Sequence, residues 1–176
     1  MATKQITIER FIVISAKTFA EVASAIAAQV GHPDIKQFYE AIQAAEDDQE
    51  LQRVVNDAIG PSDLMEFMRF DQGAVLRHEL GPGAPNIMRL LIGNPLTMRK
   101  MARHVHDAGS YAPVTVLIDE RADGVHLSYD RMASLSHLMG IRRLWKLPEL
   151  WIVKLKFSCC QPHNDCRNIT RRRINE

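Results

Sequence analysis

The stretch that decides the fold is residues 88–101, which read Met88-Arg-Leu-Leu-Ile-Gly-Asn-Pro-Leu-Thr-Met-Arg-Lys-Met101. Its first part is mainly apolar, as in a buried strand, and the strand is expected to stop at Gly93. Gly93 allows a backbone turn that a Cβ would resist, Asn94 can accept a hydrogen bond from the new helix, and Pro95 suits the first helical position. The sequence therefore predicts a strand that passes directly into a helix.

This helix start is also a candidate binding site. The first turn of a helix carries partial positive charge and free backbone N–H groups, which suit a carboxylate or a phosphate. The candidate ligand-binding residues are therefore the cap and the nearby cations: Gly93, Asn94, Arg89, Arg99 and Lys100. The competing interpretation is purely structural, because Asn and Pro are preferred at helix starts for folding alone.

The region before this stretch predicts a strand, a helix and a helical insertion. Apolar residues alternate over residues 6–15, which indicates a first strand. Thr18 and Glu21 form a capping box for a helix that runs to about Val30, with Gly31 as its left-handed stop. Residues 32–66 are acidic and Gln-rich. Two or three short helices are expected there, with Pro33-Asp34 and Asp47-Asp48 as start signals, as an insertion that covers the domain. The simplest interpretation of the insertion is a solvated helical pair that has only a packing role.

The region after it predicts a mainly antiparallel sheet. A strand is expected to begin at Phe67, while residues 74–78 fit either a strand or a helical turn. The second helix should run to about Asp107 and end at Gly109. Residues 114–120 and 125–129 predict a hairpin, since Asp-Gly is a strong short-turn signal. The expected fold is α+β, β-α-(helical insert)-β-β-α-β-β, with two helices on one sheet in a single domain spanning residues 1–136.

Composition excludes several classes of function. A formal net charge of +1 gives no electrostatic reason to expect nucleic acid or a membrane as partner. No apolar run is long enough for a membrane span or a signal peptide, so a cytoplasmic location is expected. No phosphate-loop or dinucleotide fingerprint is present, and no cofactor is expected.

No side-chain cluster predicts catalysis or metal binding. Cys159, Cys160 and Cys166 lie near His163, but adjacent cysteines rarely suit one tetrahedral zinc ion. Histidines 104 and 106 point about 200° apart on a helix, so they cannot bind one metal ion together. The charged residues at 119–123 are weak candidates for catalysis, because they flank a turn where such residues are ordinarily solvated. No catalytic residue and no metal ligand is therefore assigned.

Four segments resemble the bacterial domain of unknown function numbered 302, over about residues 6–136. They are Phe70-Asp-Gln-Gly-Ala-Val-Leu76, Leu91-Ile-Gly-Asn-Pro95, Tyr111-Ala-Pro-Val-Thr-Val-Leu117 and Gly124-Val-His-Leu-Ser-Tyr-Asp130. The resemblance implies a compact α+β fold that is commonly dimeric, and it implies no particular activity. Some branches carry cysteines just before the Asn-Pro and in the loop before the next strand. This chain has Gly93 and residues 112–114 there, so no thiol or metal role is carried over.

The tail departs from this resemblance after residue 136. The family would continue with an amphipathic helix, whereas this chain has Pro148 in the middle of the corresponding segment, where it would interrupt a helix. When Arg143–Cys160 is back-translated and read in the second frame, permitted codons give Ala-Leu-Glu-Val-Ala-Arg-Ala-Leu-Asp-Arg-Lys-Val-Glu-Val-Leu-Leu-Leu. This peptide is a strong helix former. We therefore hypothesise that the coding sequence shifted frame near residues 137–142.

The expected function is a non-enzymatic domain that associates with itself, as a homodimer, or binds a small anionic ligand. The alternative is a small enzyme that acts at the Gly93-Asn94-Pro95 helix start. A cleft there with Asp119 or His78 beside Asn94 would favour the enzyme, and a filled apolar interface would favour the binding module.

The frame-shift hypothesis predicts that restoring the second frame after about residue 137 stabilises the protein. Each buried Leu or Val side chain of the restored helix should contribute about 1.5–3 kcal/mol. The two versions are compared by thermal melting, and equal melting temperatures would refute the prediction. Sequencing of the gene is the direct check, because stop codons or a polar second frame in this stretch would rule the shift out.

Overall fold

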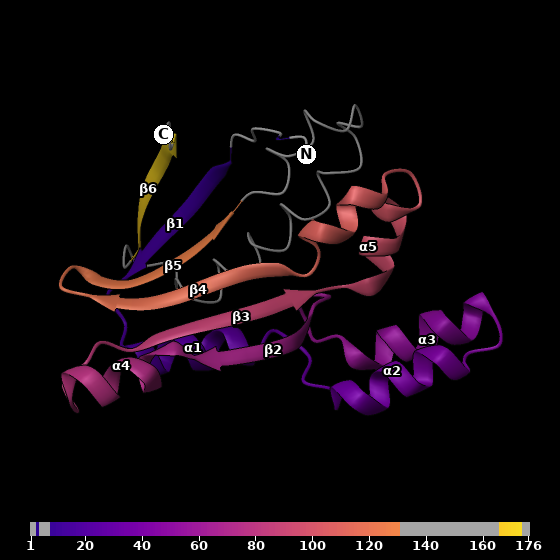
Figure 1. Cartoon of the computed structure of the whole chain (residues 1–176), viewed down its shortest axis with the longest axis horizontal. Helices are drawn as coiled ribbons and strands as arrows, with labels where there is room; N and C mark the ends of the chain where they lie inside the picture. The colour runs from indigo at the N-terminus through magenta and orange to yellow at the C-terminus, as the bar shows by residue number, and fades with distance from the viewer. Residues whose placement is uncertain (1–2, 4–7, 131–165, 174–176) are drawn as a thin grey trace.

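The computed structural model describes residues 3, 8–130 and 166–173, the last of these as backbone only. The fold is α+β, as predicted (Figure 1). Five antiparallel strands lie in the order β2-β3-β4-β5-β1, and a sixth, β6, pairs with the outer edge of β1. Residues 131–165, where the frame shift is predicted, lie outside the described part. The elements are β1 (Glu9–Ser15), α1 (Phe19–Ala27), α2 (Ile35–Ala44), α3 (Asp48–Ala58), β2 (Met65–Asp71), α4 (Gln72–Leu80), β3 (Ile87–Gly93), α5 (Pro95–Ala102), the 3-10 helix η1 (His106–Tyr111), β4 (Val114–Arg121), β5 (Gly124–Asp130) and β6 (Cys166–Arg173).

Helix α1 covers one face of the sheet and builds the main core. The predicted capping box is present, since Thr18 Oγ1 accepts from the Glu21 N–H at 3.3 Å and the Glu21 carboxylate accepts from the Thr18 N–H at 2.8 Å. The apolar stripe of the helix is buried against alternate residues of the strands. The core consists of Val13, Val22, Ile26, Val30, Leu64, Leu90, Ile92, Val116, Ile118, Val125 and Leu127.

Gly31 does not end α1, and that prediction is wrong. The helix ends at Ala27, and Ala28 is its C-cap in a right-handed conformation. Gly31 instead allows a close backbone approach, because a Cβ there would lie 1.9 Å from the Ala58 carbonyl oxygen. The N–H groups of Gly31 and Gly60 both donate to the Leu64 carbonyl at 2.8 Å. These two glycines form the neck through which the α2–α3 hairpin joins the sheet.

The helical insertion is two helices, and its predicted starts are correct. Asp34 and Asp47 are the N-caps of α2 and α3, accepting from the backbone N–H groups of Gln37 and Glu50 at 2.9 Å and 2.7 Å. The hairpin stands beside the start of β2 and next to α5 rather than over the sheet, contrary to the expectation that it covers the domain (Figure 1). The reason is that its buried stripe packs on Met65, at the start of β2.

The structure decides one open segment and corrects the length of one predicted helix. The undecided residues 74–78 belong to helix α4, whose cap Asp71 accepts from the Ala74 N–H at 2.9 Å. The helix after Pro95 ends at Ala102 and not near Asp107, and Gly109 lies inside η1. Val105 adopts an extended conformation, which interrupts the helix and lets Ala108 pack fully buried beside Met101. Tertiary packing therefore overrides local helix propensity here.

The passage from β3 to α5 forms as predicted around Asn94. The Asn94 carboxamide oxygen accepts from the N–H groups of Leu96 and Thr97 at 2.9 Å and 3.3 Å, and its carbonyl accepts from the Met98 N–H at 3.0 Å. Pro95 has no N–H to satisfy. The carboxamide nitrogen of Asn94 donates to the Asp63 carbonyl at 2.9 Å, which ties the helix start to the turn before β2.

The two roles of Asn94 are separable by substitution. Asn94→Ser keeps a capping oxygen and loses the donor to Asp63, whereas Asn94→Ala loses both. We expect the free energy of unfolding of Asn94→Ala to be about 1 kcal/mol lower than that of Asn94→Ser. The native protein should be the most stable of the three. Urea titration followed by circular dichroism measures the order, and equal stabilities of the Ala and Ser variants would contradict the capping role.

Candidate functional site

The helix start has no backbone donor left for an anion. Of the first four positions of α5, Pro95 lacks an N–H, and those of the next three residues are all engaged by Asn94. An anion at this place would have to displace the cap that forms the helix. The geometry therefore favours the structural interpretation of the Gly93-Asn94-Pro95 turn, and any ligand must use other groups.

The structure separates the candidate binding residues. Asn94 and Arg99 line a common pocket. Arg89 lies on β3, four residues before the strand ends, with its guanidinium 5.8 Å from the Phe70 ring centroid. Lys100 is exposed on α5 and does not line the pocket.

Gly93 is required for packing and not for a turn. It is buried, and a Cβ there would lie 3.2 Å from Pro113 Cα and 3.5 Å from Phe67 Cε2. Its missing side chain lets β2 and the loop before β4 approach the end of β3. Phe67 and Pro113, which take this space, are themselves part of the pocket wall.

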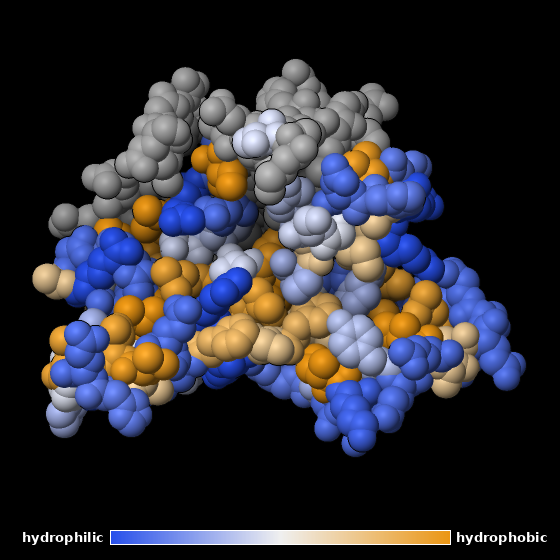
Figure 2. Space-filling view, in the orientation of Figure 1, coloured by the Kyte–Doolittle hydropathy of each residue, from blue (hydrophilic) through white to orange (hydrophobic). Residues whose placement is uncertain are grey.

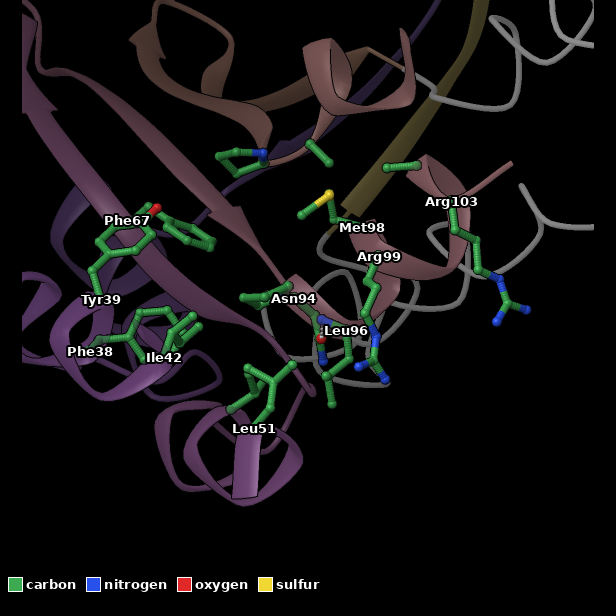
Figure 3. A pocket seen from close by; sticks show the side chains of 15 residues that line it. Phe38, Tyr39, Ile42, Leu51, Phe67, Asn94, Leu96, Met98, Arg99 and Arg103 are labelled. Atoms are coloured by element: carbon green, nitrogen blue, oxygen red, sulfur yellow. Dashed lines mark hydrogen bonds between the residues drawn. The ribbon is translucent and has the colours of Figure 1, made fainter. Parts of the chain in front are cut away.

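The pocket has a volume of about 500 Å³ and lies between the α2–α3 hairpin and α5. Figure 3 shows Phe38, Tyr39 and Ile42 from α2, with Phe67 from β2, on one side. The α5 side chains lie on the other side, and Leu51 of α3 lies at the edge. Nearly all lining groups are apolar, among them Val55, Leu96, Met98, Ala102 and Pro113.

Two cations line the pocket, Arg99 of α5 and Arg103, the C-cap residue of this helix. Arg99 and Arg103 are one helical turn apart and therefore share a face of the helix. Among the described residues that line the pocket there is no carboxylate. Arg99 makes an ion pair with Asp48 of α3, whose side chain is 61% exposed. The Arg103 Nε–H donates to His104 Nε2 at 3.0 Å.

The pair between Arg99 and Asp48 links α5 to the first residue of α3. The Arg99 guanidinium, and then the Gln52 amide at 2.6 Å, lower the pKa of Asp48 below its ordinary value. A lowered carboxyl pKa stabilises the fold above the unfolded-state pKa, and this contribution is lost as the pH falls through the folded-state pKa. The contribution is small because both side chains are exposed to solvent.

The titratable groups proposed for the enzyme alternative lie far from Asn94. Asp119 is paired in the sheet with Ile87, at the opposite end of β3. His78 lies in α4, which follows the end of β2 where Asp71 pairs with Met88. Neither residue lines the pocket. The pocket thus offers cations and apolar surface but, within the described residues, no acid or base for catalysis.

The charged hairpin tip is partly buried, contrary to expectation. Asp123 is exposed, but Asp119 is 7% exposed and bonds to Arg121. His126 is also buried, and its Nε2 lies 2.8 Å from a carboxylate oxygen of Asp123. This bond is the largest cause of the lowered pKa of Asp123. These contacts tie the hairpin tip to the sheet.

Sequence reasoning missed the aromatic wall of the pocket. Phe38 and Tyr39 belong to the insertion, for which the sequence indicates only a packing role. The core buries only part of the apolar surface of α2, since Phe38 is 5% exposed whereas its neighbour Tyr39 is 49% exposed. Adjacent aromatic residues on a short insertion were the available signal, but the sequence does not show which other element faces them.

Comparison with known proteins identifies a family and a similar fold. The family model described as "Domain of unknown function DUF302" matches residues 41–147. The crystal structure of the uncharacterized conserved protein DUF302 from Bacillus stearothermophilus has a TM-score of 0.56 at 10% sequence identity, and the match covers 86% of this chain and 98% of that chain. No curated protein matches the chain.

The end of β3 at Gly93 closely approaches Pro113, and Ala112 and Pro113 line one part of the pocket. No helix within the described residues is long and apolar enough to cross a membrane. The family match spans more than half of the chain and includes the β3–α5 turn and the β4–β5 hairpin, and the chain therefore belongs to the DUF302 family of domains of unknown function.

Proposed function

We propose that this domain binds a small, mainly apolar molecule in the pocket between the α2–α3 hairpin and α5. The observation that carries the proposal is an apolar cavity of about 500 Å³ with aromatic side chains on one wall. Ligand pockets are typically cavities of about 300–1,000 Å³, lined by apolar and aromatic groups with a few polar ones. Transfer of an apolar ligand from water into such a cavity is favourable.

The pocket walls are held by specific contacts, which supports a preformed site. The glycine neck fixes where the hairpin leaves the sheet, and the Asn94 bond to Asp63 fixes the turn beside it. A preformed cavity spares the ligand the cost of ordering its walls. The absence of an acid or base among the described lining residues favours a binding module over an enzyme. We propose that it acts in the cytosol, on the grounds of composition given above.

A bulky residue inside the pocket should abolish binding of an apolar probe. N-phenyl-1-naphthylamine is neutral, apolar and fluorescent in apolar surroundings. We expect Ala102→Phe, which fills the cavity, to weaken its binding at least about tenfold, because probe and side chain would compete for the same space. Fluorescence titration is the measurement, alongside a melting curve that shows whether each variant is folded.

The matched control is Val75→Phe on α4, where Val75 is 72% exposed and away from the pocket. This control should bind like the native protein. The proposal fails if the native protein does not bind the probe, or if a folded Ala102→Phe variant binds it equally well.

A second candidate function is self-association through the sheet face opposite α1. Met68 and Phe70 of β2 are 49% and 39% exposed there. In the sheet register Leu91 pairs with Met68, and Arg89 lies between Phe70 and Leu117. Figure 2 shows apolar side chains in a band across the middle and lower part of this view. An exposed apolar patch on a soluble domain often marks an interface.

This second proposal predicts a homodimer that dissociates when a charged residue is introduced into the apolar patch. Met68→Glu on the patch should produce a monomer, because it would bury an unpaired carboxylate in the interface. Val75→Glu, which adds the same charge elsewhere on the surface, should not. Sedimentation velocity measures both, and a monomeric native protein at high concentration would exclude the proposal.

A further inference from the structure

We infer that the ligand is an amphipathic organic carboxylate, whose apolar body fills the pocket and whose carboxylate takes the place of Asp48 on Arg99. This inference rests on the proposed function and adds the chemical class of the ligand. It also assigns a role to the ion pair between α5 and α3. The charges of the pocket, the geometry of that pair and the state of the helix start support it.

The charge of the pocket selects an anion. Its two charged lining residues in the described part of the chain are Arg99 and Arg103, on one face of α5. Figure 3 shows both side chains leaving the α5 side of the pocket, away from the aromatic wall. An elongated ligand that places its apolar body against this wall would have its polar end beside the arginines. A cationic ligand would meet two like charges there.

The Arg99 site already holds a carboxylate, that of Asp48. A guanidinium binds carboxylates through paired N–H donors, so a ligand carboxylate matches the group that is present. The side chains of Arg99 and Asp48 are 40% and 61% exposed, and exposed ion pairs contribute little to stability. Asp48 also retains the Gln52 amide as a partner. Exchange of one carboxylate for another therefore costs the protein little.

The helix start itself cannot supply an anion site. Its backbone N–H groups are engaged by Asn94, so a free inorganic anion would find only side-chain cations that are open to water. Affinity must then come mainly from the apolar body, and the carboxylate adds selectivity. The ligand class is thus set by the combination of an apolar cavity with arginines at one side.

The exchange has a structural consequence for the hairpin. When a ligand carboxylate occupies Arg99, Asp48 is released and the polar link between α3 and α5 opens. The hairpin then stays attached through its glycine neck and through the ligand that contacts both walls. Ligand binding thereby replaces a direct contact between α3 and α5 with one that passes through the ligand.

The test compares decanoate with decanamide, which differ in charge and share the apolar chain. Both displace N-phenyl-1-naphthylamine in a fluorescence competition on the full chain. We expect decanoate to bind about threefold more tightly than decanamide, because only decanoate pairs with Arg99 and this pair is exposed to solvent. Arg99→Ala should remove this preference by weakening decanoate alone. Asp48→Asn should strengthen decanoate binding, since it removes the competing carboxylate.

Arg53→Ala is the matched control, because Arg53 is an exposed cation of α3 that pairs with Glu50 and does not line the pocket. It should leave both affinities unchanged. Equal affinities of decanoate and decanamide, or equal losses of both in Arg99→Ala, would overturn the inference and leave the proposed function standing. Acetate or phosphate displacing the probe as well as decanoate does would also overturn it. Failure of the neutral probe and of decanamide to bind at all would instead refute the proposed function.

Discussion

The rest of the structure depends on the hydrogen bonds that Asn94 makes through both the oxygen and the nitrogen of its carboxamide. Its carboxamide oxygen starts α5, and its carboxamide nitrogen holds the turn at Asp63. That turn leads from the α2–α3 hairpin into β2, so one side chain joins the sheet, the helix and the hairpin. A half-buried amide that uses both its oxygen and its nitrogen satisfies its donors and acceptors in few ways, which fixes these elements in one arrangement.

The pocket is a consequence of that arrangement. The position of the hairpin is fixed at its neck, where the backbones at Gly31 and Gly60 lie against each other. This close contact keeps the hairpin beside the sheet and not over it. It stands beside α5 instead, with its apolar stripe partly unburied and facing the helix. Two short helices and α5 thereby enclose space that none of them fills. A proposed ligand would complete this packing, as an apolar residue would in an ordinary core.

Local chemistry made much of the fold predictable. Caps at Thr18, Asp34, Asp47 and Asn94 all form, because each side chain satisfies an orphan backbone N–H within three residues. The β4–β5 hairpin is local for the same reason. The sequence does not decide between strand and helix for α4, because the apolar periodicity there is weak and Val75 is exposed in the structure. The second helix was predicted too long, since burial of Ala108 depends on contacts that are distant in sequence.

The sequence by itself determined the caps at which α1, α2, α3 and α5 begin, the β4–β5 hairpin, which family the chain resembles, and that no catalytic motif is recognisable. These properties depend on neighbours within a few residues along the chain. Tertiary structure alone decided the roles of Gly31 and Gly93, since a missing Cβ acquires its meaning from the backbone that packs against it. It also decided that Arg99 faces Asp48 while Arg89 lies over Phe70. The candidate site depends on which surfaces face each other, and Phe38 and Arg99 line one pocket only after the chain has folded.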